Sequence, residues 1–162
     1  SCIIANIFSI MPLTTPPHAA VELILCENSV ELALPLLSNS ISAGFPSPAL
    51  DFIDLKIDLN THLIKHPSAT FFGRVKGHSM KDAGIGDDDL IIIDKSIPPS
   101  NGKIAVCYLD GEFTLKQIKI IDKEIWLMPA NSAYKGIKME AFHHLVVWGV
   151  VTYVIKKIPC SL

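Results

Sequence analysis

The chain has 162 residues, of which 49% are hydrophobic; this suits one compact domain with an additional arm and excludes a disordered chain. The 14 lysines and arginines against 16 aspartates and glutamates give a formal net charge of −2, which argues against binding nucleic acid through a basic face. Four scattered cysteines without a C-x-x-C pair predict neither a disulfide framework nor a zinc site and favour a reducing cytoplasm. No apolar stretch reaches the roughly 18 residues that a membrane-spanning helix needs.

Residues 1–43 are predicted to form a flexible N-terminal arm. Residues 1–10 are apolar but have no basic start, so they do not resemble a secretory signal, and we interpret them as an extension. Beyond them, prolines separate short apolar patches that can pair or pack locally. The Pro-Ser-Pro sequence at 46–48 predicts a rigid extended hinge, and the compact domain is expected to span residues 44–162.

The elements after the hinge are predicted to be mainly strands. A short helix is expected over 58–64, with Asp58 as its N-cap. A helical turn is expected over 80–83, and Asp110-Gly111 is a strong hairpin signal. Alternating or continuous apolar patterns predict strands over 69–75, 89–94, 103–109, 112–121, 124–128 and 145–155. Together they predict a mainly β fold, a twisted, partly closed barrel with one or two short helices.

Ser79 is a candidate nucleophile because of the turn that precedes it. Gly77 can adopt backbone geometries that other residues resist, so the chain can turn sharply and present Ser79 at the start of a short helix. The backbone N–H groups of His78 and Ser79 would then be placed to stabilise an oxyanion. The alternative is structural: Ser79 would only cap the helical turn.

Lys116 is the candidate base for this serine. On a strand, Thr114 and Lys116 point to the same face, so the threonine hydroxyl can orient the amine. A free lysine has a pKa of about 10.4, and acting as a base near neutral pH requires burial without a carboxylate partner. Glu112 shares this face but lies about 13 Å from Lys116 along a strand, which makes it a poor ion-pair partner. The alternative is an ordinary exposed strand lysine.

Three other features have simpler structural interpretations. The acidic run 87–89 is expected to form a turn, and Cys107 to be a small buried hydrophobic residue. His143 and His144 are adjacent, so on a strand they face opposite ways and cannot bind one metal together. We therefore predict no metal site and no cofactor.

A set of motifs in a fixed order resembles the UmuD group of the LexA-type self-cleaving peptidases. The resemblance covers about residues 43–158, and as an ordered set it is far more specific than any single motif. Two positions depart from the usual pattern: His78 replaces an acidic residue and Asp88 replaces a common glycine, and neither side chain is essential to the dyad. The motifs are GFPSPA at 44–49, IDLN at 57–60, HPSAT at 66–70, GHSM at 77–80, AGI at 83–85, DGEFT at 110–114, NSAY at 131–134 and WGVV at 148–151.

The resemblance implies a chemical role for each matching position. Ser79 matches the family's nucleophile, Lys116 its general base, Thr114 the threonine near that lysine, and Ala43-Gly44 its scissile bond. In the family, cleavage within one chain or by a partner chain is promoted by RecA assembled on single-stranded DNA. The shortened product joins UmuC in a translesion DNA polymerase, and members are β-rich homodimers.

The leading hypothesis is thus an SOS-induced, cytoplasmic, self-cleaving serine peptidase whose processed form serves an error-prone polymerase. One alternative is a non-enzymatic scaffold that binds a polymerase through its strand edges. Another is a fragment of a LexA-like repressor, but the N-terminal DNA-binding domain of that branch is not found in residues 1–43, so direct sequence-specific DNA binding is not expected. No association with a membrane is expected either.

Overall fold

The computed structural model describes residues 21–25, 33–36, 55–140 and 144–158. The chain divides into two compact units, residues 27–67 and residues 1–26 together with 68–162, and each is described by itself. No helix in the described ranges is long and apolar enough to span a membrane.

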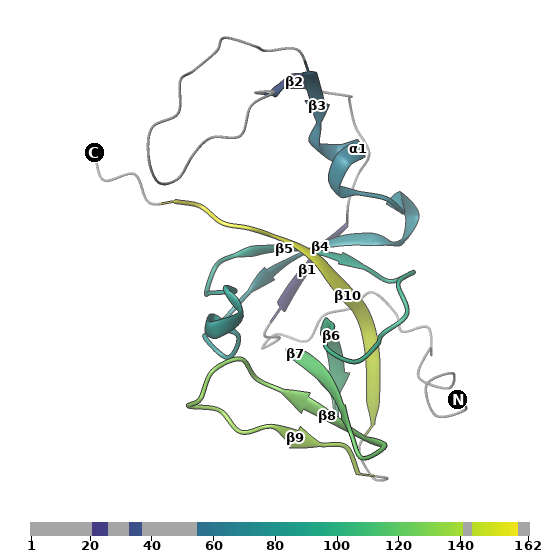
Figure 1. Cartoon of the computed structure of the whole chain (residues 1–162), viewed down its shortest axis with the longest axis vertical. Helices are drawn as coiled ribbons and strands as arrows, with labels where there is room; N and C mark the ends of the chain where they lie inside the picture. Colours follow the sequence, from purple (N-terminus) through teal and green to yellow (C-terminus); the bar gives the residue numbers. More distant parts are fainter. Residues whose placement is uncertain (1–20, 26–32, 37–54, 141–143, 159–162) are drawn as a thin grey trace. The chain divides into compact units, whose positions relative to one another are not determined.

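The larger unit is built on one antiparallel sheet of eight strands (Figure 1). Two 3-10 turns, η2 (Pro67–Ala69) and η3 (Lys81–Ala83), flank strand β4 in the sequence. The sheet ends at β1 and β9, so among the described residues it does not close on itself. In spatial order its strands are β1 (Val21–Leu25), β4 (Thr70–Val75), β5 (Leu90–Asp94), β10 (Leu145–Ile155), β6 (Ile104–Leu109), β7 (Glu112–Ile121), β8 (Glu124–Met128) and β9 (Ile137–Lys138).

Strand β10 joins the two halves of this sheet. Its first part, from Leu145 to Val150, pairs with β6, and its second part, from Val150 to Ile155, pairs with β5. The register shifts once in each part, and such bulges bend a strand and increase its twist. Gly149 lies at one of these shifts, where a Cβ atom would come within 2.6 Å of Ile93 Cγ2. The glycine thus permits the close approach of β10 to β5.

The smaller unit contains a two-stranded antiparallel sheet and the predicted helix. Strand β2 (Ala33–Leu36) pairs with β3 (Leu55–Asp58), and helix α1 (Leu59–Leu63) follows directly. The carboxylate of Asp58 accepts hydrogen bonds from the backbone N–H groups of Asn60 and Thr61, both at 3.2 Å. The prediction of Asp58 as the N-cap is confirmed.

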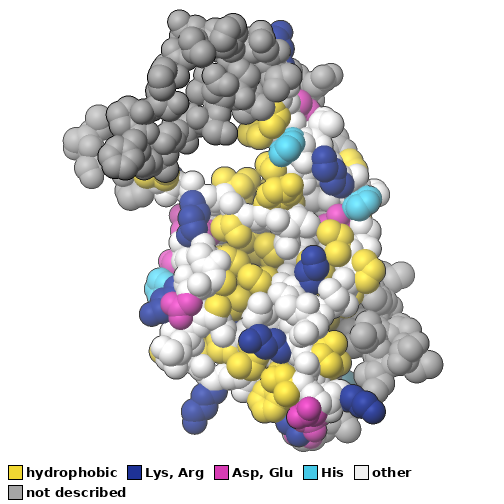
Figure 2. Space-filling view, in the orientation of Figure 1, with side chains coloured by type: hydrophobic (Ala, Val, Ile, Leu, Met, Phe, Trp, Pro, Cys, Tyr) yellow, Lys and Arg dark blue, Asp and Glu magenta, His cyan; other side chains and the backbone are white. Residues whose placement is uncertain are grey.

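Each face of the large sheet carries a separate buried cluster of apolar side chains. Trp148 belongs to the first cluster and makes edge-to-face contacts with Phe71 and Phe113. Other apolar side chains remain on the surface and gather over the middle of the larger unit on the side drawn in Figure 2. The first core consists of Val75, Met80, Ile85, Ile91, Ile93, Val106, Phe113, Leu115 and Trp148. The second core consists of Ala105, Cys107, Ile118, Leu127 and Val147.

The mainly β prediction with few helices is confirmed, and the predicted strands agree with the observed ones to within a residue. The hairpin between β6 and β7 turns at Asp110 and Gly111, both with positive φ, as a tight two-residue turn requires. The structure adds four strands to the predicted pattern: β1 and β9 in the large sheet, and the pair of β2 and β3 in the smaller unit. Residues 21–25, within the predicted arm, form β1 and pair with β4, and the short β9 pairs with β8. The predicted boundary between residues 43 and 44 lies outside the described residues.

Candidate active site

Ser79 lies in a tight turn between β4 and η3. Gly77 has a φ of 90°, in the left-handed region that favours glycine, and its N–H donates to Asp87 Oδ1 at 2.6 Å. The next side chain after Ser79, that of Met80, is buried in the first core. The Met80 carbonyl accepts from the N–H of Ala83 at 3.0 Å and closes the helical turn. The turn is thus anchored on both sides of Ser79, whose own side chain stays half-buried.

The acidic run beside this turn has the predicted turn-forming role. Asp88, with a φ of 64°, pairs with Arg74 at 2.9 Å on the surface. Asp89 is nearly buried and accepts from Gly86 N–H and from Lys156 Nζ, both at 2.6 Å. Together with the bond from Asp87 to the Gly77 N–H, these contacts fix the loop that supports the Ser79 turn.

Lys116 extends from β7 to Ser79 and is only 8% exposed, so the alternative of an ordinary exposed strand lysine is wrong. Its amine contacts three oxygen atoms. Nζ lies 2.9 Å from Thr114 Oγ1, 3.1 Å from the Leu115 carbonyl oxygen and 3.4 Å from Ser79 Oγ. An ammonium can donate to all three oxygens. A neutral amine can donate to Thr114 and Leu115 and keep its lone pair for the Ser79 hydroxyl proton.

Burial lowers the pKa of Lys116 below its usual value because the low-dielectric surroundings disfavour the ammonium form. A negatively charged Cys107 thiolate would instead raise the pKa of Lys116, whereas the neutral thiol would not. Burial also raises the pKa of Cys107 to about 12, so this thiol is neutral over the range in which Lys116 titrates. Desolvation is therefore the main influence on the pKa of Lys116, and among the described residues no carboxylate contributes to the shift of this pKa.

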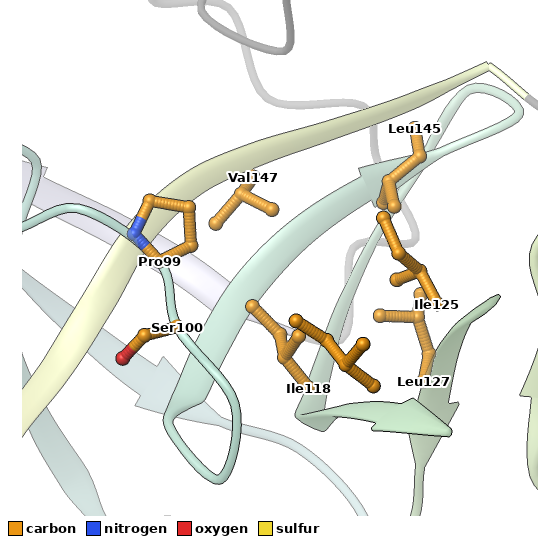
Figure 3. Close-up of a pocket in the computed structure, with 8 residues that line it drawn as sticks. Pro99, Ser100, Ile118, Ile125, Leu127, Leu145 and Val147 are labelled. Carbon is orange, nitrogen blue, oxygen red and sulfur yellow. The ribbon is translucent and has the colours of Figure 1, made fainter. Parts of the chain in front are cut away.

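An apolar pocket opens on the same face of β7 as Lys116 (Figure 3). Thr114, Lys116 and Ile118 alternate with Phe113 and Leu115 along the strand, so they share the face of the second core. The pocket measures about 370 Å³ with its open mouth included. It is lined by Pro99, Ser100, Ile118, Ile120, Ile125, Leu127, Leu145 and Val147.

The loop between β8 and β9 contacts the Ser79 turn, which the sequence did not predict. The buried side chain of Asn131 donates from Nδ2 to the His78 carbonyl oxygen at 2.7 Å. Next to it, the N–H of Asp82 donates to the Ala130 carbonyl oxygen at 2.8 Å. Asn131 lies 53 residues from His78 in the sequence. The only sequence feature that singles out Asn131 is its place in the NSAY motif.

The structure brings together most of the predicted site residues. Ser79, Lys116 and Thr114 form one hydrogen-bonded group, and His78 belongs to the turn that presents Ser79. The predicted cleavage site, Ala43-Gly44, lies outside the described residues. Cys107 is completely buried, as predicted. His144 is exposed, and its neighbour at position 143 lies outside the described residues.

This geometry is that of a serine beside a buried lysine. Comparisons with known proteins show which family the chain belongs to. The Peptidase S24-like family model matches residues 35–152, more than half of the chain. SamA from Salmonella typhimurium is 40% identical over 131 residues, which cover 81% of this chain and 91% of SamA. MucA from Escherichia coli is 37% identical over 131 residues, covering 80% of this chain and 89% of MucA. ImpA from Shigella flexneri is 37% identical over 125 residues, covering 76% of this chain and 83% of ImpA.

SamA, MucA and ImpA are UmuD-like SOS mutagenesis proteins, so the resemblance drawn from the ordered motifs is confirmed. The matched region includes the Ser79 turn, strand β7 and most of β10. The chain therefore belongs to the S24 peptidase family.

Proposed function

We propose that this chain is a self-cleaving serine peptidase in which Ser79 is the nucleophile and Lys116 the general base. The observation that carries the proposal is the approach of the buried Lys116 amine to Ser79 Oγ at 3.4 Å. A serine hydroxyl needs a neighbouring base, and a lysine is a base only in its neutral form. Burial favours that form, since no carboxylate of the described residues contributes to the pKa of Lys116, and family membership supports a peptidase reaction.

The proposed reaction begins with transfer of the Ser79 hydroxyl proton to the neutral amine of Lys116. Ser79 Oγ then forms a bond to the carbonyl carbon of Ala43, and the backbone N–H groups of His78 and Ser79 stabilise the resulting oxyanion. When the intermediate collapses, the bond between Ala43 and Gly44 breaks. The Lys116 ammonium gives its proton to the departing Gly44 nitrogen.

An ester between Ala43 and Ser79 remains after this step. Lys116, neutral again, takes a proton from a water molecule, which attacks the ester carbonyl and releases the Ala43 carboxylate. The proton returns from Lys116 to Ser79 Oγ, so no cofactor is consumed. Thr114 and the Leu115 carbonyl accept hydrogen bonds from the amine throughout and keep it directed toward Ser79.

The biological role that we propose follows the UmuD-like relatives. Residues 1–43 are removed when RecA on single-stranded DNA promotes cleavage in the cytoplasm. Residues 44–162, as a homodimer, then serve as the accessory subunit of a UmuC-type translesion polymerase. Membership of a family with SOS mutagenesis relatives supports this role.

The test is mass spectrometry of the purified protein after incubation at pH 10, together with Ser79→Ala and Lys116→Ala. Lys103→Ala provides a matched control, because Lys103 is an exposed lysine that lies just before β6. We expect a new fragment that begins at Gly44 in the unaltered protein and in the control, and its absence from the other two variants. A fragment formed by either Ser79→Ala or Lys116→Ala would refute the dyad.

The polymerase role needs a separate cellular test. Ser79→Ala should abolish damage-induced mutagenesis, and expression of residues 44–162 alone should restore it. If Ser79→Ala supports mutagenesis at the normal level, the chain acts as a scaffold that does not require cleavage.

A further inference from the structure

The peptide bond between His78 and Ser79 is held from its carbonyl side by Asn131. Asn131 Nδ2 donates to the His78 carbonyl oxygen at 2.7 Å, and the Asn131 side chain is buried. Its Oδ1 accepts from the N–H of Ala133 at 3.0 Å, which fixes the orientation of the side-chain amide. The Asn131 carbonyl also accepts from the N–H of Tyr134 at 3.0 Å. The donor that reaches His78 is thus locked into its own loop.

Holding this carbonyl also directs the N–H group of the same peptide unit. A peptide bond is planar and trans, so its C=O and N–H point in opposite directions. When Asn131 fixes the oxygen of His78, it fixes the direction of the Ser79 N–H on the other side of the plane. Within the described part of the chain, no acceptor takes a hydrogen bond from the Ser79 N–H. This donor remains available to a reacting group.

We propose that Asn131 is a positioning residue of the peptidase reaction, which aims the Ser79 N–H at the developing oxyanion. The inference rests on the proposed function, because it assigns a task within that reaction. It adds a residue from the loop between β8 and β9 to a site otherwise built from the Ser79 turn and β7. Asp87 holds the start of the same turn through the Gly77 N–H, so the turn is restrained from two directions.

The loop has a second attachment that does not depend on the Asn131 side chain. The N–H of Asp82 donates to the Ala130 carbonyl at 2.8 Å, and this bond joins two backbones. Substitution of Asn131 should therefore leave the loop in place and change mainly the restraint on the His78 carbonyl. This separation makes the proposal testable in the folded full-length chain.

The experiment measures the first-order rate of self-cleavage from pH 7 to pH 11 for the unaltered chain, Asn131→Ala and Asn131→Asp. Asn131→Asp retains an acceptor for the Ala133 N–H but, when ionised, has no donor for the His78 carbonyl. Asn101→Ala is the matched control, because Asn101 also accepts a backbone N–H, that of Ile120 at 3.0 Å, in an exposed loop. Circular dichroism establishes that each variant is folded.

Both Asn131 variants should lose about 10- to 100-fold of the plateau rate reached at high pH, as expected when a catalytic donor is misdirected. The plateau is compared because Lys116 is deprotonated there in every variant. In Asn131→Ala the midpoint of the pH profile should stay unchanged, since the surroundings of Lys116 are untouched. Asn101→Ala should match the unaltered chain.

Plateau rates within twofold of the unaltered chain in both Asn131 variants would overturn the inference and leave the dyad intact. A midpoint that rises in Asn131→Ala with an unchanged plateau would also overturn it, because a merely structural role would act by hydrating Lys116. Failure of the proposed function gives a different result: no cleavage by the unaltered chain at any pH, or cleavage by Ser79→Ala.

Discussion

Replacement of Thr114 by valine tests how the site directs its base. Valine has nearly the same shape as threonine but cannot accept the hydrogen bond from Lys116 Nζ, which at 2.9 Å is the shortest of the three contacts of this amine. A hydrogen bond of this kind contributes about 0.5 to 1.5 kcal/mol net. Its loss allows the amine to leave its orientation toward Ser79, so the plateau rate of self-cleavage should fall about 2- to 10-fold.

The same substitution should also move the pH profile, in a direction that the structure determines. The ammonium form loses a charge-assisted hydrogen bond, which is stronger than the bond that the neutral amine loses. The pKa of Lys116 should therefore fall further, and the midpoint of the profile should shift to lower pH. Thr114→Val thus combines a slower plateau with an earlier rise.

The assay follows the fragment that begins at Gly44 by mass spectrometry at intervals from pH 7 to pH 11. Thr152→Val is the matched control: Thr152 is also a strand threonine with a hydroxyl hydrogen bond, to the Ile92 carbonyl at 3.2 Å. It should leave both the plateau and the midpoint unchanged. A midpoint that moves to higher pH in Thr114→Val, or an unchanged plateau, would refute the orienting role of Thr114.

Three further predictions follow from burial and close packing. Because the pKa of Lys116 is lowered in the folded state, the charged amine destabilises the fold below that pKa, and this cost is lost as the pH rises toward the unfolded value of about 10.4. In urea denaturation at pH 7, Lys116→Met should therefore have a free energy of unfolding higher than that of the unaltered chain by on the order of 1 kcal/mol. This gain should shrink by pH 10.5. Gly149→Ala would place a Cβ atom against Ile93 and should lower the free energy of unfolding by about 1 to 3 kcal/mol. Thermal denaturation measures this change, and an unchanged melting temperature would contradict the close packing of β10 on β5. Cys107, buried and with its pKa raised to about 12, should escape iodoacetamide at pH 8 in the folded chain and react after unfolding, as mapped by peptide mass. Modification of Cys107 itself in the native protein at the rate of a free thiol would contradict its burial.

Much of the fold could be predicted because its signals are local. The Asp110-Gly111 turn fixes the β6–β7 hairpin, and period-two alternation then places Thr114 and Lys116 on one face. The burial of Lys116 could not be decided in this way. It depends on whether the second face of the sheet is covered, and Ile118 and Leu127 of the second core show that it is.

The contacts that the sequence could not predict all join distant segments. Asn131 reaches His78 across 53 residues, and no local pattern specifies that pairing. The sequence of residues 21–25 predicts only a short apolar patch within the arm, because five residues of this kind do not identify their partner strand. Strand β9 has two residues, which is too short for a periodic signal.

The course of β10 has a consequence for the newly made chain. Ser79 belongs to the half of the sheet that contains β4 and β5, and Lys116 to the half that contains β6 and β7, while β10 is the strand between β5 and β6. Among the described strands it is also the last one in the sequence. Until residues 145–155 are available, the strand that pairs with both β5 and β6 is missing, so the large sheet cannot be completed. If the proposed function holds, the strands that place Ser79 and Lys116 join into one continuous sheet only after β10 has been made, so self-cleavage is expected to begin late in synthesis rather than on the growing chain.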